Sequence, residues 1–144
     1  MNSGVRCVIC SARGGRPRGV IAELAASWVT AEAEAPLPGY VCVVSKRHVK
    51  EPFGLPKALR QAFFEDCMVV ARALDQLLAP RKLNYEIHGN TVPHLHMHLY
   101  PRYPGDPYEG GPIGNTVTFR RTPEELAGIA DAVLMVWEEQ AGGD

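Results

Sequence analysis

A run of alternating histidine and apolar residues, 94–100, constrains the fold of this chain more than any other stretch. Side chains of a β-strand alternate between its two faces, so an extended run places Leu95, Met97 and Leu99 on one face and three histidines on the other. Neutral imidazole binds metals, attacks electrophiles and carries protons near neutral pH. The run therefore predicts a strand with one core face and one face for chemistry, the alternative being a polar strand face without a role.

The length and charge of the chain limit what it can be. Its 144 residues suit one domain, and 46% hydrophobic with 22% charged residues is typical of a globular protein. A formal net charge of -1 gives no general attraction to nucleic acid or membrane. No apolar run approaches a membrane span, and no signal core follows the first residues. We expect a cytoplasmic protein without membrane or nucleic-acid partners.

Apolar patterning predicts an α+β fold. Short apolar runs between Pro and Gly turn signals predict strands, and apolar steps of three and four predict helices. The expected elements are strands at 20–24, 28–31, 40–44 and 84–88, the histidine strand itself, and helices at 56–78 and 122–140. The strand at 84–88 and the histidine strand are expected to form a hairpin, and the Pro- and Gly-rich stretch 103–121 a loop or lid. We expect a single domain over 1–144, an antiparallel sheet of about five strands with the two helices packed on it.

Two of the four cysteines form a Cys-x-x-Cys pair, Cys7 and Cys10. That spacing lets two thiolates converge on one ion. A Gly- and Pro-rich loop at 11–19 follows where a redox motif would open a helix, which favours a metal knuckle over a redox pair or two unliganded thiols. Cys42 lies inside an expected strand and Cys67 on a helical apolar stripe, so both are expected to pack in the core.

The histidine run resembles the signature of the histidine triad (HIT) superfamily of nucleotide hydrolases and transferases, His-φ-His-φ-His-φ-φ with φ apolar. Residues 94–100 match it in full, and the Pro101-Arg102 that follows is also common in the family. The resemblance implies a HIT-like fold, commonly a homodimer, and a small-molecule nucleotide substrate. It makes His96 the nucleophile, which attacks the α-phosphorus to form a nucleotidyl-imidazole.

A second resemblance concerns a metal. A zinc-bearing branch of the superfamily pairs an N-terminal Cys-x-x-Cys with the histidine of a Lys-Arg-His-like segment and the first histidine of the triad. The chain is similar over residues 7–102, with His48 ending Lys46-Arg47-His48. The implied ligands are Cys7, Cys10, His48 and His94. A closed set of four ligands leaves no position for substrate, so the implied Zn²⁺ is structural.

The resemblance also implies the remaining site residues. His98 becomes a catalytic residue that contacts the phosphate or the leaving group. Donors around the α-phosphate would be Asn84, Asn90 and Thr91, and donors of this kind stabilise developing charge. Asn90 stands where the family most often has glutamine, and the connection from Asn84 to His94 is short, which leaves the phosphate contacts and the substrate open. His88 is expected to be a histidine of the sheet surface.

The expected function is hydrolysis at the α-phosphate of a dinucleoside polyphosphate, such as diadenosine tetraphosphate, or of a related nucleoside phosphate, with release of a nucleoside monophosphate. The alternatives are a nucleoside phosphoramidase and a nucleotidyl transferase or phosphorylase, because these share the first half-reaction. A zinc-stabilised nucleotide-binding protein without turnover is the alternative from another class.

Overall fold

A five-stranded antiparallel sheet forms the centre of the computed structural model, which describes residues 7–10, 15–116 and 118–142. In order across the sheet, the strands are β1 (Val20–Glu23), β2 (Ser27–Thr30), β4 (Val41–Ser45), β6 (His96–Arg102) and β5 (Lys82–Ile87). Every neighbouring pair is antiparallel. The expected sheet is confirmed, and β5 and β6 pair directly, as the hairpin prediction required.

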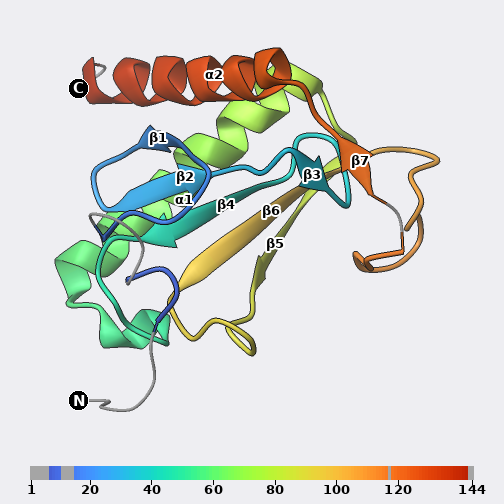
Figure 1. Ribbon diagram of the computed structural model, residues 1–144. Coiled ribbons are helices and arrows are strands. Elements are labelled where there is room, and N and C mark those ends of the chain that lie inside the picture. The colour runs from blue at the N-terminus through green and yellow to red at the C-terminus, as the bar shows by residue number, and fades with distance from the viewer. Residues whose placement is uncertain (1–6, 11–14, 117, 143–144) are drawn as a thin grey trace.

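Two long helices pack on this sheet (Figure 1). Helix α1 (Lys57–Leu78) crosses behind β4 and β6, and α2 (Pro123–Gly142) lies along α1 and β1. A short 3₁₀ turn, Pro52–Gly54, precedes α1. Helix α2 begins at a capping box, because the backbone N–H of Glu125 donates to Thr122 Oγ1 (3.1 Å) and Thr122 N–H to Glu125 Oε1 (3.5 Å). Both helices lie where their apolar periodicity predicted them.

The alternation of the histidine run divides β6 between core and surface. Leu95, Met97 and Leu99 are buried in the core against α1, and Cys67 on α1 is fully buried there, as expected. His96 and His98 lie on the opposite face, which neither α1 nor α2 covers, and both are partly buried. The face that carries the chemistry is therefore held by a strand whose other face is anchored in the core.

A second, two-stranded sheet was not expected from the sequence. β3 (Glu34–Ala35) pairs with β7 (Phe119–Arg120), inside the stretch predicted to be loop. Arg121, which follows β7, is buried and donates from Nη1 to the carbonyl oxygen of Tyr40 (2.7 Å) and from Nη2 to that of Glu32 (2.7 Å). This small sheet ties the segment before α2 to the start of β4.

The loop after β6 is ordered around Arg102. Its Nε donates to Asp106 Oδ2 (2.9 Å), its Nη2 to the carbonyl oxygen of Tyr108 (2.7 Å) and its Nη1 to that of Gly111 (2.8 Å). The guanidinium lowers the pKa of Asp106 to about 2, so the ion pair persists in mild acid. The Pro- and Gly-rich stretch is thus fastened to the end of β6.

Within the residues described, no helix is long and apolar enough to cross a membrane.

Candidate active site and metal centre

Four metal-ligating side chains meet beside the first residues of β6. Their ligand atoms, on Cys7, Cys10, His48 and His94, all lie within 4.8 Å of one another. Cys10 Sγ is 3.3 Å from His48 Nδ1, Cys7 Sγ is 3.5 Å from His94 Nδ1, and the two Nδ1 atoms are 3.0 Å apart. A tetrahedral zinc site separates sulfur from nitrogen by about 3.6 Å and nitrogen from nitrogen by about 3.3 Å, from its bond lengths. The four residues expected from the resemblance are therefore together, and their atoms and spacing fit zinc.

His94 is oriented for this cluster by the backbone. Its ring is buried, and Nε2 donates to the carbonyl oxygen of Ser45 (2.7 Å), which leaves Nδ1 unprotonated toward the thiols. Burial lowers the pKa of His94, which favours the neutral form that binds metals. Burial and the neighbouring Cys7 raise the pKa of Cys10 to about 11. A metal that binds here must therefore displace the proton from the Cys10 thiol.

His96 makes the complementary hydrogen bond. Its Nδ1 donates to the carbonyl oxygen of His94 (2.6 Å), so the proton sits on Nδ1 and Nε2 keeps its lone pair. The register pairs His96 with Val44 across β4 and β6. In the neutral ring Nε2 is therefore the nitrogen that can act as a nucleophile.

His98 is held by an aromatic stack. Tyr40 Oη lies 2.7 Å from His98 Nδ1, and the two rings are nearly parallel at 12°. Tyr100 stacks on Tyr40 with 4.6 Å between ring centroids. Burial, with His96 and His88 nearby, lowers the pKa of His98 to about 4. His98 is therefore a neutral imidazole at neutral pH, and its ring is fixed from one side.

Cys42 does not lie in the core, and the prediction for this residue is wrong. The register pairs it with His98, and residues that pair across antiparallel strands share a face. Its Sγ lies 3.4 Å from His98 Nδ1 and 2.9 Å from Tyr40 Oη. Val41, Val43 and Val44 beside Cys42 are all apolar, so the sequence of this strand shows no alternation that would tell its two faces apart.

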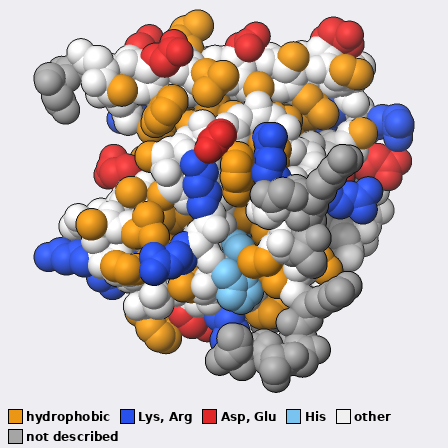
Figure 2. Space-filling model, turned by 60° about the vertical axis from the view of Figure 1, so that its left-hand side comes forward, with side chains coloured by type: hydrophobic (Ala, Val, Ile, Leu, Met, Phe, Trp, Pro, Cys, Tyr) orange, Lys and Arg blue, Asp and Glu red, His pale blue; other side chains and the backbone are white. Residues whose placement is uncertain are grey.

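An open cavity of about 330 Å³ adjoins His96 on the β4 side. Its walls come from the knuckle, from the segment before β1 and from strands β2 and β4; they are Val8, Ile9, Pro17, Arg18, Thr30, Cys42, Val44 and His96. The space-filling view shows histidine side chains reaching the surface together as one patch among apolar side chains (Figure 2). Apolar walls with a few convergent polar groups are typical of small-molecule sites.

On the other side of β6, β5 contributes an acidic residue and a histidine. Glu86 pairs with His98 in the register, and Glu86 Oε1 lies 2.8 Å from His88 Nε2. The His88 and His98 rings are 5.4 Å apart between centroids, at 61°. His88 is 51% exposed, as expected of a sheet-surface histidine, and its ring contacts that of His98.

The three predicted phosphate donors lie in different places. Asn84 pairs with Tyr100, and its Oδ1 accepts a hydrogen bond from Arg102 (2.8 Å). Asn90 and Thr91 are exposed in the bend between β5 and β6. The register therefore separates Asn84 from His96 by four residues along β6, while two residues, Val92 and Pro93, separate the other two from the histidine run.

Sequence reasoning assigned no role here to Tyr40, Cys42 or Glu86. All three face His98 only because of the pairing register of β4, β6 and β5. Tyr40, Cys42 and Val44 stand at every second position of one strand and therefore share a face. Which face this is follows only once the strand is paired with the histidine run.

Comparison with known proteins supports the resemblance to the histidine triad superfamily. Residues 13–105 match the HIT domain family. "Protein hit" from Bacillus subtilis is 30% identical over 101 residues, which cover 66% of this chain and 68% of that protein.

Solved structures share the fold. A histidine triad protein from Bradyrhizobium japonicum has a TM-score of 0.72 at 26% identity, over 81% of this chain and 87% of that one. A zinc-bound histidine triad family protein from Mycobacterium smegmatis has a TM-score of 0.65 at 21% identity, over 96% and 97%. The histidine run, the sheet that carries it and the matched residues together place this chain in the HIT domain family.

Proposed function

We propose that the protein is a nucleotide hydrolase that works through a nucleotidyl-His96 intermediate. The observation that carries this proposal is the 2.6 Å hydrogen bond from His96 Nδ1 to the carbonyl oxygen of His94, which leaves Nε2 as a nucleophile beside the cavity. Attack by Nε2 on the α-phosphorus forms a P–N bond and breaks the bond to the leaving group. Water then releases a nucleoside monophosphate, so one difficult displacement becomes two easier ones.

The cavity supports a nucleoside as the part of the substrate that is held. Its volume of about 330 Å³ and its apolar walls suit a flat base and sugar, and Arg18 supplies a cation at the same wall. With the nucleoside there, the α-phosphate lies over His96. His98 lies two residues on, where it contacts the phosphate or the leaving group, and Asn90 and Thr91 remain the proposed phosphate donors, with Asn84 further along β5.

The cluster of Cys7, Cys10, His48 and His94 is proposed to hold a structural Zn²⁺. Two thiolates and two imidazoles satisfy a tetrahedral ion and leave no position for substrate. The bound ion supplies rigidity rather than chemistry. His94 then holds the carbonyl group that orients His96, so the cluster and the nucleophile are linked through one residue.

The candidate substrates share the first half-reaction, in which a nucleotidyl group is transferred to His96. A dinucleoside polyphosphate such as diadenosine tetraphosphate is the proposed substrate. Phosphoramidates and transfer to phosphate or another acceptor are the alternatives, because only the leaving group and the acceptor differ. Addition of inorganic phosphate to the assay separates phosphorolysis from hydrolysis by the product.

Intact mass spectrometry after a rapid quench at neutral pH tests the proposal. The protein is mixed with diadenosine tetraphosphate or with adenosine 5′-phosphoramidate, and His96→Ala is treated in parallel. We expect an added adenylyl group on the wild-type protein and none on the variant. Nucleotide release at the wild-type rate by His96→Ala would contradict the covalent route. Binding without release by the wild-type protein would favour a nucleotide-binding protein.

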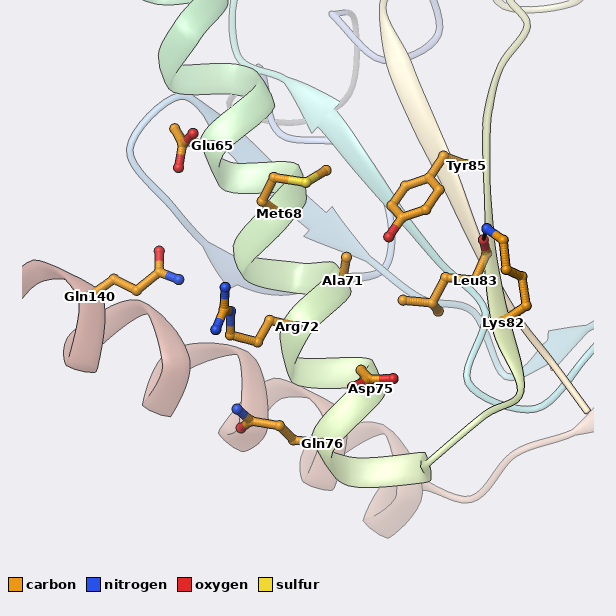
Figure 3. A pocket seen from close by; sticks show the side chains of 10 residues that line it. All are labelled: Glu65, Met68, Ala71, Arg72, Asp75, Gln76, Lys82, Leu83, Tyr85 and Gln140. Atoms are coloured by element: carbon orange, nitrogen blue, oxygen red, sulfur yellow. Dashed lines mark hydrogen bonds between the residues drawn. The ribbon is translucent and has the colours of Figure 1, made fainter.

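We also propose that the protein is a homodimer joined through the α1 and β5 side of the molecule. A groove of about 690 Å³ lies between them, with Met68 from α1 and Tyr85 from β5 reaching into it (Figure 3). β5 is an edge strand, and its Tyr85 and Ile87 are 44% and 37% exposed. Unpaired strand edges readily pair with a second copy, and a two-fold axis would extend the sheet.

The mass of the protein in solution tests the proposed homodimer. Light scattering during gel filtration is expected to give twice the mass of the chain, and Tyr85→Lys is expected to lower it toward the monomer. Lys57→Glu, an exposed change at the start of α1, is the control. A wild-type protein that remains monomeric at high concentration would overturn the dimer without affecting the active-site proposal.

A further inference from the structure

One imidazole of the histidine patch has no role in the scheme above. Of the five histidines in the chain, two belong to the metal cluster, His96 is the nucleophile and His98 is held against Tyr40. His88 remains. It follows Ile87, which pairs with Met97, and its ring lies 5.4 Å from that of His98, which in turn lies 4.8 Å from that of His96. Its 2.8 Å contact with Glu86 gives it a fixed partner.

The pair of Glu86 and His88 lies on the opposite side of β6 from the cavity. The cavity is walled by β2 and β4, β6 comes next in the sheet, and β5 follows at the edge. With the nucleoside in the cavity and the α-phosphorus at His96, the leaving group departs opposite His96 Nε2, and β5 is the strand beside His96 on the side away from the nucleoside. His88 is 51% exposed there, so water reaches the same position once the leaving group has gone.

The chemistry of the pair suits proton transfer. A carboxylate that accepts a hydrogen bond from one nitrogen of an imidazole fixes its tautomer and stabilises its protonated form. Glu86 contacts Nε2 of His88, so Nδ1 is the nitrogen left to exchange a proton with substrate or water. Glu86 is also the acidic partner of His98 in the register, which keeps the pair close to the reacting atoms.

We propose that His88, oriented by Glu86, is the general acid that protonates the leaving group and the general base that activates water to hydrolyse the nucleotidyl-His96 intermediate. This assignment rests on the proposed function. It makes His88 the residue that completes the hydrolytic half of the reaction, and it names leaving groups that need a proton, such as amines and alcohols, as the class that depends on it most.

The two half-reactions balance. In the first, His96 Nε2 forms the P–N bond, the bond from phosphorus to the leaving group breaks, and the proton on His88 Nδ1 passes to the leaving atom. In the second, the oxygen of water forms the new P–O bond while one of its protons passes to His88 Nδ1. The P–N bond breaks, and its electron pair returns to His96 Nε2. Both histidines end in their starting states.

The test separates the two half-reactions with the p-nitrophenyl ester of adenosine 5′-monophosphate, whose leaving group needs no proton, so His88 gives its Nδ1 proton to solvent before it acts as the base. His88→Gln is expected to release the first equivalent of p-nitrophenolate as fast as wild type. Its steady-state turnover is expected to fall about 10²-fold, the range for loss of a general base. Intact mass should then show an adenylyl group accumulating on the variant. With adenosine 5′-phosphoramidate, formation of the adduct itself should also slow.

Glu86→Gln keeps the imidazole and loses its carboxylate partner, so we expect a fall of roughly 10-fold in the same steady-state rate, the scale of one charge-assisted hydrogen bond. Glu34→Gln is the matched control, because Glu34 also pairs with a cation, Arg120 at 3.3 Å, but lies in the small β3–β7 sheet. It should leave both half-reactions unchanged.

The outcomes distinguish the two proposals. An adduct that forms on wild type and on His88→Gln and is hydrolysed equally fast on both would overturn the role of His88 alone. A slower first burst of p-nitrophenolate from His88→Gln would also overturn it, because it would place His88 in binding or attack. No adduct on any form of the protein would overturn the nucleotidyl-His96 route, and the assignment of His88 with it.

Discussion

His94 and His96 are two residues apart in the chain, yet each occupies a different kind of site. His94 donates Nε2–H to the carbonyl oxygen of Ser45, and His96 donates Nδ1–H to that of His94. His94 therefore keeps its lone pair on Nδ1, whereas His96 keeps its lone pair on Nε2. His94 is 2% exposed among four ligands, whereas His96 is partly exposed beside a cavity. The backbone carbonyl that an imidazole contacts, rather than its position in the motif, prepares it to hold a metal or to attack a substrate.

Loss of the nucleophile should have the largest effect. His96→Ala is expected to reduce nucleotide turnover on the order of 10³-fold or more, since removing a covalent nucleophile abolishes both half-reactions. Zinc content and thermal stability should change little, because His96 is partly exposed and lies outside the cluster. Steady-state kinetics with metal analysis of the same sample checks this. A variant that lost its metal as well would break the distinction between the two histidines.

Loss of the metal cluster should have the opposite profile. The double variant Cys7→Ser and Cys10→Ser is expected to purify without zinc and to lose roughly 10 °C in Tm. Loss of a bound metal is one of the changes that destabilise a protein most. Activity measured well below the new Tm should fall less than in His96→Ala. Calorimetry and metal analysis give both readouts.

Cys42→Ala provides the control for the thiols. Its sulfur contacts Tyr40 and His98 rather than the cluster, so one equivalent of zinc should remain. If Cys42→Ala released the zinc, or if the double variant kept it, the four-ligand cluster would be wrong.

The sequence predicted the helices and the large sheet because their signals are local. The apolar steps of α1 and the capping box at Thr122 and Glu125 each lie within one element. The pair β3 and β7 has only two residues in each strand, too few for any periodicity, and their pairing joins segments more than 80 residues apart. Its existence depends on tertiary contacts such as those of Arg121, which no local pattern encodes.

The candidate site likewise combines residues that the sequence predicted with residues that only the structure brought to it. The four candidate metal ligands and the candidate nucleophile His96 were predicted from the family resemblance, and the structure adds their distances and hydrogen bonds. Tyr40 and Glu86 came from the register alone. A predicted strand does not specify which residue of its partner it faces, and a slip of one position would turn each of these side chains away from His98.

The stability of the folded protein should fall in acid because the fold keeps the buried imidazole of His98 neutral. The pKa of His98 is about 4 in the folded protein and near the ordinary 6.5 in the unfolded chain. Between these values only the unfolded chain takes up the proton, so stability falls as pH drops from 6.5 toward 4. Because His98 is partly exposed, we expect a loss of roughly 2 kcal/mol.

His98→Asn should lose this dependence. Denaturant melts of wild type and His98→Asn at several pH values between 7 and 4 measure it, and zinc release affects both proteins and cancels in the difference. Parallel curves for the two proteins would mean that His98 is not held neutral by the fold.

Tyr40→Phe should have the smallest effect and should test how the chemical face is held. Tyr40 Oη lies 2.7 Å from His98 Nδ1, and its backbone carbonyl accepts a hydrogen bond from Arg121. If the hydroxyl donates to Nδ1, the His98 proton sits on Nε2, toward the substrate. Phenylalanine keeps the stack on Tyr100 and removes about 1 kcal/mol of hydrogen bonding, so kcat should fall roughly fivefold with KM and zinc unchanged. A change confined to KM would instead place Tyr40 in substrate binding, and the tautomer of His98 would then not depend on the Tyr40 hydroxyl.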